Sequence, residues 1–207
     1  MTLPNGIDIT NLIEDLKIFS WEAADILLHY SEKIKDKNLK KEILKSVNPN
    51  NPVTVADLKV NENMINNLKE KYLATDWEIL SEENVKKEFD KSNFKSDWLW
   101  VLDPLDGTKD FIQGTGDYAM HLALNYKRKP YLGVVLIPEK DELWFSNGSE
   151  VLCERRDKSI IKPKLSRKRN LKDLTIVTSK NHRNESLKKL IERINFKNSN
   201  IMGSIGC

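Results

Sequence analysis

Apolar residues recur at helical spacing in three stretches of the chain. Steps of three and four residues predict an amphipathic helix over residues 12–34, with Asp8 or Thr10 as its N-terminal cap. A breaker cluster at 48–52 precedes a second helix that opens at Asp57, and a third is predicted over residues 187–194. Each helix has one apolar stripe, as expected of a helix that packs on one side against a core.

Strand patterns occupy the intervals between these helices. Trp98–Leu102 is a run of five apolar residues, which predicts a buried strand covered on both faces. Polar turns separate three further runs that predict an antiparallel meander, at 118–126, 131–137 and 142–145. Short strands are also predicted, at 78–81, 174–178 and 199–202. The pattern therefore predicts a chain that contains both helices and strands.

The run Trp98–Leu102 leads directly into two carboxylates. Asp103 and Asp106 flank Pro104, and Gly107 follows. The fixed φ of proline and the freedom of glycine at positive φ allow a tight turn that points both carboxylates the same way. Two converging carboxylates repel each other, and such hard oxygen ligands suit Mg²⁺ or Mn²⁺. A lone Asp-Pro-x-Asp-Gly string is, however, more often a structural turn than a metal site.

Composition and charge exclude few functions. The 207 residues suffice for one large domain or two small ones, and the formal net charge of +3 arises from many charges of both signs. The basic stretch 155–169 has few aromatic residues, so we interpret it as an exposed connection and expect no nucleic-acid partner. No apolar run approaches the ~20 residues of a membrane span, and we expect a cytoplasmic protein. Cys153 and Cys207 are interpreted as two reduced thiols.

A longer string around these carboxylates changes this picture. Asp103-Pro104-Leu105-Asp106-Gly107-Thr108-Lys109-Asp110-Phe111 resembles the signature of the Mg²⁺-dependent, lithium-sensitive inositol monophosphatase superfamily, which includes fructose-1,6-bisphosphatase and 3'(2'),5'-bisphosphate nucleotidase. Lys109-Asp110 is more similar to the nucleotidase branch, since inositol monophosphatases more often have Thr-Asn there. Two other strings resemble superfamily motifs and occur in the expected order, Val53-Thr54-x-Ala56-Asp57 and Ser81-Glu82-Glu83.

The resemblance implies an α/β layered sandwich of the inositol monophosphatase and fructose-1,6-bisphosphatase type. We expect an amino-terminal subdomain with the metal site over 1–154 and the start of a carboxy-terminal subdomain over 155–207. Two or three Mg²⁺ ions are implied, with the ligands Glu82, Asp103, Asp106 and the Leu105 carbonyl. Catalytic roles with the attacking water are implied for Glu82, for Thr108 and for Asp57, and Glu83 is a supporting or surface acid. Substrate contacts are implied for Leu105, Asp106, Gly107, Thr108, His182 and Ser204.

The proposed reaction of such a site is hydrolysis of a small phosphomonoester. The nucleotidase branch implies 3'-phosphoadenosine 5'-phosphate or its sulfated form as substrate, and hence a link to sulfate assimilation. The alternatives are an inositol or sugar monophosphatase and, in another class, a non-catalytic phosphate-binding module. The string Ser179-x-x-His182-Arg183 underlies the expectation for His182, whereas we interpret His121 as a residue of the sheet.

One expectation concerns the extent of the chain. Full-length relatives continue with a Trp-Asp-x-x-Ala element that completes the metal site, and residues 203–207 do not supply it. We therefore expect a carboxy-terminally truncated chain with little activity by itself. The oligomeric state stays open.

Overall fold

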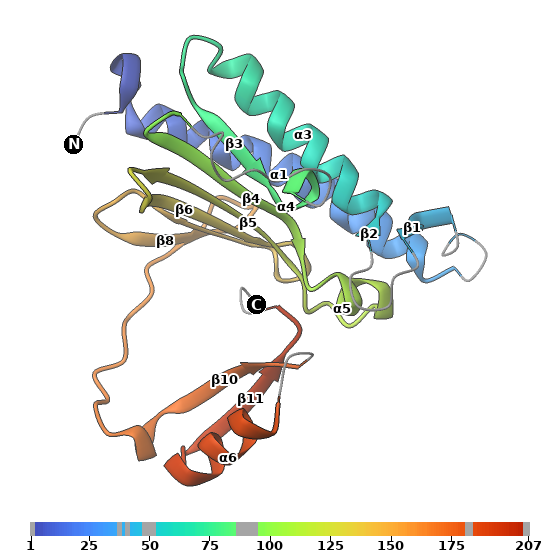
Figure 1. Cartoon of the computed structure of the whole chain (residues 1–207), viewed down its shortest axis with the longest axis vertical. Helices are drawn as coiled ribbons and strands as arrows, with labels where there is room; N and C mark the ends of the chain where they lie inside the picture. The colour runs from blue at the N-terminus through green and yellow to red at the C-terminus, as the bar shows by residue number, and fades with distance from the viewer. Residues whose placement is uncertain are drawn as a thin grey trace.

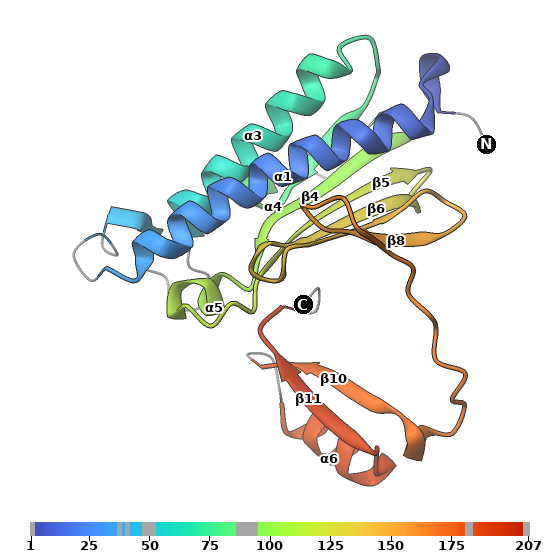
Figure 2. The same cartoon turned by 180° about the vertical axis from the view of Figure 1, so that it is seen from behind.

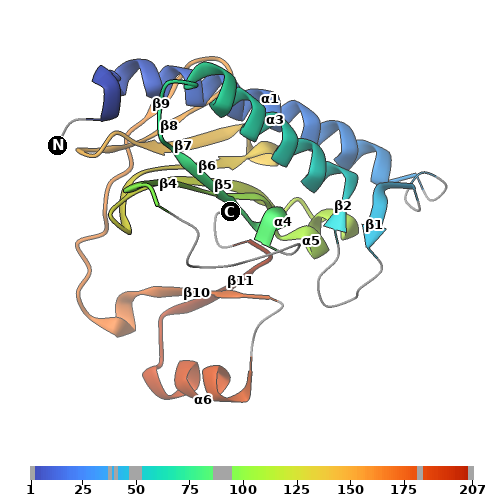
Figure 3. The same ribbon diagram turned by 45° about the horizontal axis from the view of Figure 1, so that its top comes forward.

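Two long helices lie side by side across one face of a seven-stranded sheet (Figures 1 and 2). A computed structural model of the chain describes residues 3–36, 39, 42–46, 53–85, 95–180 and 184–204. The helices are α1 (Ile9–Ile34) and α3 (Val55–Lys71). A smaller unit of two strands and one helix lies on the side of the sheet away from α1 and α3 (Figure 3). This layered arrangement confirms the expected α/β fold class.

The main sheet has the strand order β3-β4-β5-β6-β7-β8-β9. Its strands are β3 (Glu78–Ser81), β4 (Trp98–Asp106), β5 (Ala119–Tyr126), β6 (Lys129–Ile137), β7 (Glu142–Ser146), β8 (Val151–Glu154) and β9 (Ile160–Ile161). Within this sheet β3 and β4 pair in parallel, and every later pair is antiparallel. The predicted meander is therefore present as β5–β7, and β8 and β9 extend it beyond the prediction.

Short elements complete the larger part of the structure. Strands β1 (Leu44–Ser46) and β2 (Val53–Thr54) form an antiparallel pair ahead of α3. Short helices follow β3 and β4, namely α4 (Glu82–Val85) and α5 (Thr108–Gln113). The 3₁₀ turns of this part are η1 (Pro4–Gly6) and η3 (Pro138–Lys140), and a further one, η4 (Leu171–Asp173), precedes the smaller unit's first strand. Among the described residues, no helix combines the length and the apolar character that a membrane crossing requires.

The apolar stripe of α1 is buried as its spacing predicts. Asp8 begins the helix, because its Oδ1 accepts the backbone N–H groups of Thr10 and Asn11 at 2.9 and 3.0 Å. The stripe packs with the inner face of α3 and the near face of the sheet into one apolar core. Its fully buried members include Leu12, Leu16, Leu27, Met64, Trp100, Leu102, Leu122 and Leu124. Burying a side chain of this size contributes about 1.5–3 kcal/mol, so this core dominates the stability of the larger part.

The prediction that Trp98–Leu102 is covered on both faces is wrong. Trp98, Trp100 and Leu102 are buried beneath the helices, but Leu99 is only partly buried and Val101 is 37% exposed. Side chains alternate between the two faces of a strand, and α1 and α3 cover only one of them. An uninterrupted apolar run does not reveal which face is covered.

The smaller unit is a parallel βαβ arrangement. β10 (Thr175–Ser179) pairs in register with β11 (Asn198–Met202), and α6 (Glu185–Ile194) lies between them in the chain. A connection over residues 162–170, exposed throughout, joins this unit to β9. The division of the chain into 1–154 and 155–207 stays a proposal. The ladder between β8 and β9 spans this boundary, since Glu154 pairs with Ile160.

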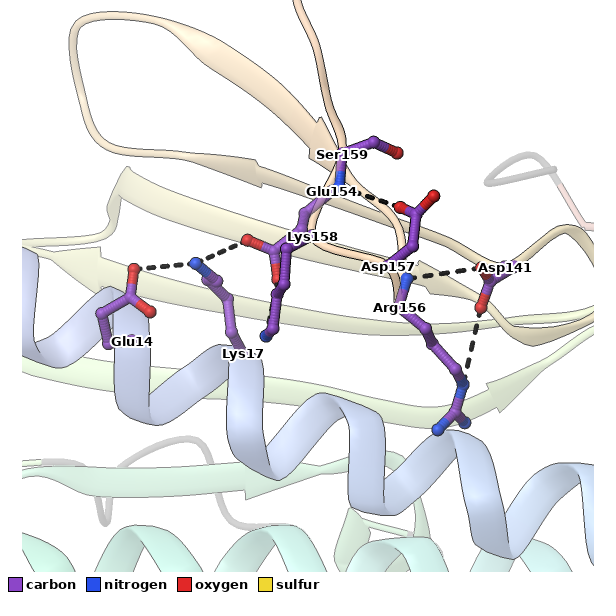
Figure 4. Close-up of polar contacts among 8 residues, drawn as sticks. All are labelled: Glu14, Lys17, Asp141, Glu154, Arg156, Asp157, Lys158 and Ser159. Carbon is purple, nitrogen blue, oxygen red and sulfur yellow. Dashed lines mark hydrogen bonds and ion pairs between the residues drawn. The ribbon is translucent and has the colours of Figure 1, made fainter.

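A buried ion pair fastens α1 to the end of β8 (Figure 4). Lys17 Nζ lies 2.6 Å from Glu154 Oε2, and the two side chains are 11% and 3% exposed. Lys17 also contacts Glu14 at 2.7 Å, and Lys158 reaches Glu154 at 3.2 Å. Burial alone would raise the pKa of Glu154, but hydrogen bonds from Lys17 and Lys158 hold it below its usual value. Glu154 is therefore charged in the folded chain.

Removal of Lys17 tests this fastening. In Lys17→Met, Glu154 remains buried with Lys158 as its remaining cation. We expect the free energy of unfolding to fall by about 2–3 kcal/mol, below the full cost of an unpaired buried charge. Lys35→Met is the matched control, because its pair with Glu32 at 2.7 Å is exposed and such pairs contribute little to stability. Urea unfolding followed by tryptophan fluorescence measures both variants, and equal losses would contradict the assignment.

Candidate functional site

The carboxyl end of β4 interrupts its regular pairing with β5. Asp103 pairs with His121 of β5 and Asp106 with Ala119, and the register shifts between these pairs. The Leu105 N–H donates to Asp103 Oδ1 at 3.1 Å. Both carboxylates therefore lie at the carboxyl end of the strand with partly exposed side chains. Pro104 and Leu105 between them are buried.

Gly107 allows the chain to leave this turn and begin α5. Its φ is +86°, in the left-handed region that favours glycine. A Cβ at this position would lie 2.6 Å from the backbone oxygen of Asp117 and 3.4 Å from the Cβ of Ser204. The turn thus needs glycine for its conformation and for the close approach of two other segments.

Parallel pairing brings a third acidic residue to the same edge. Ser81, the last residue of β3, pairs with Leu102, so the residue after each, Glu82 and Asp103, follows at the same end of adjacent strands. Burial raises the pKa of Asp103 well above its usual range, and the charges of Glu82 and Asp106 raise it further, as does the hydrogen bond that protonated Asp103 donates to Glu82. The sheet therefore crowds three carboxyl groups that repel one another when charged.

The donor set fits a hard divalent cation. Carboxylate oxygens and a backbone carbonyl such as that of Leu105 are the ligands that Mg²⁺ accepts. As they stand among the described residues, no three or more His, Cys, Asp or Glu side chains form a group that could hold a metal ion. Glu82 is exposed, and it hydrogen-bonds to Asp103. A cation that took the place of the proton between these carboxyls would relieve the repulsion that raises the pKa of Asp103.

Asp57 caps the start of α3 with one oxygen and contacts Thr108 of the site with the other. Thr54 and Asp57 form a capping box, in which Asp57 Oδ2 accepts the backbone N–H of Thr54 at 2.7 Å. Its other oxygen, Oδ1, lies 3.4 Å from the Thr108 hydroxyl, which also donates to the Leu105 carbonyl at 3.0 Å. Burial raises the pKa of Asp57 to about 6 despite the bonds from Thr54, and the charge of Glu83 contributes to this rise.

Two more side chains contact Asp106. The Ser204 hydroxyl, fully buried, donates to Asp106 Oδ2 at 2.5 Å. His121 Nε2 lies 3.7 Å from the same oxygen, beyond hydrogen-bond distance, and burial lowers the pKa of His121. His121 is a residue of the sheet, as interpreted from the sequence, and its place in β5 also puts it next to Asp106.

The structure brings most of the sequence-predicted residues to one place. The carboxyl ends of β3 and β4, with the start of α3, hold Asp57, Glu82, Asp103, Leu105, Asp106, Gly107 and Thr108, and Ser204 reaches them from the end of β11. His182 and Cys207 lie outside the described residues. Glu83 is buried, with 4% exposure, whereas Glu82 is exposed.

Sequence reasoning missed a contact behind this site. Asp110 is buried and pairs with Lys180 at 2.9 Å. The dipeptide Lys109-Asp110 was informative only as part of a motif, and no local pattern connects Asp110 to a lysine 70 residues away.

Two curated proteins illustrate what this chain is similar to in sequence. A 3'(2'),5'-bisphosphate nucleotidase CysQ of Shigella flexneri is 30% identical over 155 residues, which are 75% of this chain and 60% of that protein. The chloroplastic bifunctional phosphatase IMPL2 of Arabidopsis thaliana is 37% identical over 117 residues, 56% of this chain and 32% of that protein. The chain thus spans about 60% of the length of the nucleotidase that it matches.

A solved structure supports the fold, and a family comparison identifies the family. An inositol monophosphatase (IMPase) structure from Thermotoga maritima superposes with a TM-score of 0.69 at 20% identity, over 94% of this chain and 69% of that one. This likeness confirms the expected layered α/β fold. The inositol monophosphatase family is matched over residues 10–207, almost the whole chain. This chain belongs to the inositol monophosphatase family.

Proposed function

We propose that this chain carries the metal site of a Mg²⁺-dependent phosphomonoester hydrolase. Its substrate in this proposal is 3'-phosphoadenosine 5'-phosphate or the sulfated form of that nucleotide. The observation that supports it most is the crowding of Glu82, Asp103 and Asp106 at adjacent strand ends, together with the rise in the pKa of Asp103 that burial and the two neighbouring charges cause. Strongly perturbed carboxyl groups of this kind occur preferentially at functional sites.

Different groups at this site would bind the metal ions and the substrate. Glu82, Asp103, Asp106 and the Leu105 carbonyl would hold two or three Mg²⁺ ions. The chemistry that these ions supply when bound is the acidification of a water molecule and the neutralisation of charge on the phosphate and the leaving oxygen. The backbone amides of Gly107 and Thr108 would bind phosphate oxygens and orient the ester for in-line attack.

Thr108 and Asp57 provide a path for the proton of the attacking water. The Thr108 hydroxyl lies between the site and Asp57 Oδ1, at 3.4 Å from that oxygen. A pKa of about 6 leaves Asp57 mostly charged at pH 7 and still basic enough to accept a proton. Thr108 would take a proton from water as it gives its own to Asp57.

The nucleotide substrate rests on resemblance to the nucleotidase branch. Lys109-Asp110 and the 30% identity with the S. flexneri nucleotidase favour it. A role in sulfate assimilation, lithium sensitivity and a cytoplasmic location belong to the same proposal. An inositol or sugar monophosphatase is the second candidate, favoured by the likeness to an IMPase structure. A non-catalytic phosphate-binding module is the candidate of another class.

A substrate panel separates these candidates. Adenosine 3',5'-bisphosphate and inositol 1-phosphate are titrated calorimetrically into the 207-residue chain, with and without Mg²⁺, and phosphate release is measured in parallel. We expect Mg²⁺-dependent binding that is tighter for the nucleotide, because the proposed site binds phosphate through the metal. Tighter binding of inositol 1-phosphate would favour the second candidate. Nucleotide binding that is indifferent to Mg²⁺, without phosphate release, would favour the non-catalytic module.

Substitution of one ligand tests the metal assignment. Asp106→Asn keeps the size of the side chain and an oxygen for the Ser204 hydroxyl but removes the charge. We expect Mg²⁺ affinity, and any phosphate release, to fall about a hundredfold or more, since a metal site supplies several kcal/mol, with the fold retained by circular dichroism. Glu82→Gln should behave alike and Glu83→Gln more mildly. Asp97→Asn, at an exposed ion pair, is the control, and unchanged Mg²⁺ affinity in Asp106→Asn would refute the assignment.

The raised pKa of Asp57 predicts a pH dependence of stability. The folded chain holds this proton up to about pH 6, against an ordinary pKa of 3.8. The folded state therefore binds more protons than the unfolded state, and stability contributed by Asp57 falls as pH rises from about 4 to 6, by at most about 3 kcal/mol. Asp57→Asn still accepts the Thr54 N–H but cannot titrate, so its urea midpoint should fall less over this range in metal-free buffer. Parallel profiles for the two proteins would contradict the buried carboxyl.

A further inference from the structure

A buried carboxylate in α5 receives a lysine from the smaller unit. The Asp110 side chain is 1% exposed, and Lys180 Nζ lies 2.9 Å from its Oδ1. The Thr115 hydroxyl donates to the same oxygen at 2.9 Å. A buried charge is costly unless it is paired and hydrogen-bonded, so Asp110 depends on Lys180, which follows β10.

The backbone of Lys180 makes a second contact, with the end of β11. Its N–H donates to the Met202 carbonyl at 2.8 Å. Gly203 comes next and lies directly against Asp110, since a Cβ there would be 2.4 Å from Asp110 Cγ and 2.7 Å from the Asp117 oxygen. Lys180 thus contacts α5 through its side chain and holds β11 through its main chain.

The segment held in this way ends on a residue of the proposed metal site. Ser204 follows Gly203, and its buried hydroxyl donates to Asp106 Oδ2 at 2.5 Å. This bond satisfies one carboxylate oxygen and leaves Oδ1 of Asp106 for another partner. The position of the hydroxyl depends on residues 202–203, which Lys180 and Asp110 fix.

We propose that Lys180 and Asp110 are a positioning pair, which hereafter we call the Asp110–Lys180 joint. The joint holds the Ser204 hydroxyl against Asp106 and thereby orients this carboxylate toward the metal. Hydrogen-bonded partners of metal-binding carboxylates typically change metal affinity about 10–100-fold when removed. This inference rests on the proposed function, because it assigns to Asp106 the role of a ligand.

The joint has a matched control within the chain. Lys162 pairs with Glu150 at 3.0 Å, but both side chains are largely exposed, at 70% and 44%. Lys180→Met and Lys162→Met therefore each remove one lysine from an ion pair of similar length, and only the former leaves a carboxylate buried. Lys180→Arg retains the charge and serves as the rescue.

The first measurement is amide hydrogen exchange of the free 207-residue chain, which needs no metal. In Lys180→Met we expect the amides of β11 and residues 203–204 to exchange about tenfold faster or more, as for a segment that opens locally, while β4–β7 are unchanged. Lys162→Met should leave β11 as in the parent, and Lys180→Arg should restore it. Unchanged exchange in Lys180→Met would overturn the joint.

The second measurement is binding of Mn²⁺, used in place of Mg²⁺ and counted by electron paramagnetic resonance. We expect half-saturation in Lys180→Met at about tenfold higher Mn²⁺. Ser204→Ala, which leaves the joint intact, should raise it similarly, and the double variant should add little, because coupled residues are not additive. Faster exchange with unchanged Mn²⁺ affinity would mean that the joint only holds β11 in place, and it would overturn the positioning role.

Failure of the proposed function gives a different result. If the parent chain takes up no Mn²⁺ at millimolar concentration, Asp106 is not a ligand and the metal site is refuted. That result also overturns the positioning role toward a metal. The exchange measurement then still decides whether Lys180 holds β11, so the two failures are distinguishable.

Discussion

Repulsion among carboxyl groups at the end of β4 is the constraint on which the rest of the structure depends. Asp103 lies beside Glu82 and Asp106, and partial burial makes their charges more costly together than in water. Their proximity is imposed by parallel pairing of β3 with β4 and by the tight turn at Gly107. The apolar core beneath β4 supplies the stability that holds this unfavourable cluster in place, as is common where a fold supports a reactive site.

Elements with a long periodic pattern could be predicted, and elements that depend on a neighbour could not. The stripes of α1 and α3 and the alternation of β5–β7 are properties of the local sequence, so their positions followed closely. β8 and β9 are short, and β9 has only two residues, both exposed. Such strands exist because a partner lies beside them. The exposure of Val101 has the same origin, since it depends on where the helices lie rather than on the strand.

The same distinction between local pattern and dependence on neighbours applies to the residues of the site. Motif resemblance identified Asp57, Asp103, Asp106 and Thr108, which the fold brings together although Asp57 and Thr108 are 51 residues apart. The burial of Glu83 and the exposure of Glu82 were not predictable, because they depend on how the first turn of α4 faces α3. The pairing of Asp110 with Lys180 is likewise a property of the assembled chain. A motif thus identifies residues that the fold brings together, whereas the contacts around them are not accessible from sequence.

The exposed connection over residues 162–170 affects the free energy with which the smaller unit docks onto the rest of the chain. The smaller unit is tethered to the sheet at one end by this connection and bound at the other through Lys180 and Ser204. Its docking is therefore an intramolecular association, whose strength depends on the effective concentration that the tether provides. The entropy of closing such a loop grows only logarithmically with its length. Insertions into the connection would consequently leave the docked arrangement almost as favourable, whereas a change at the bound end would affect it directly.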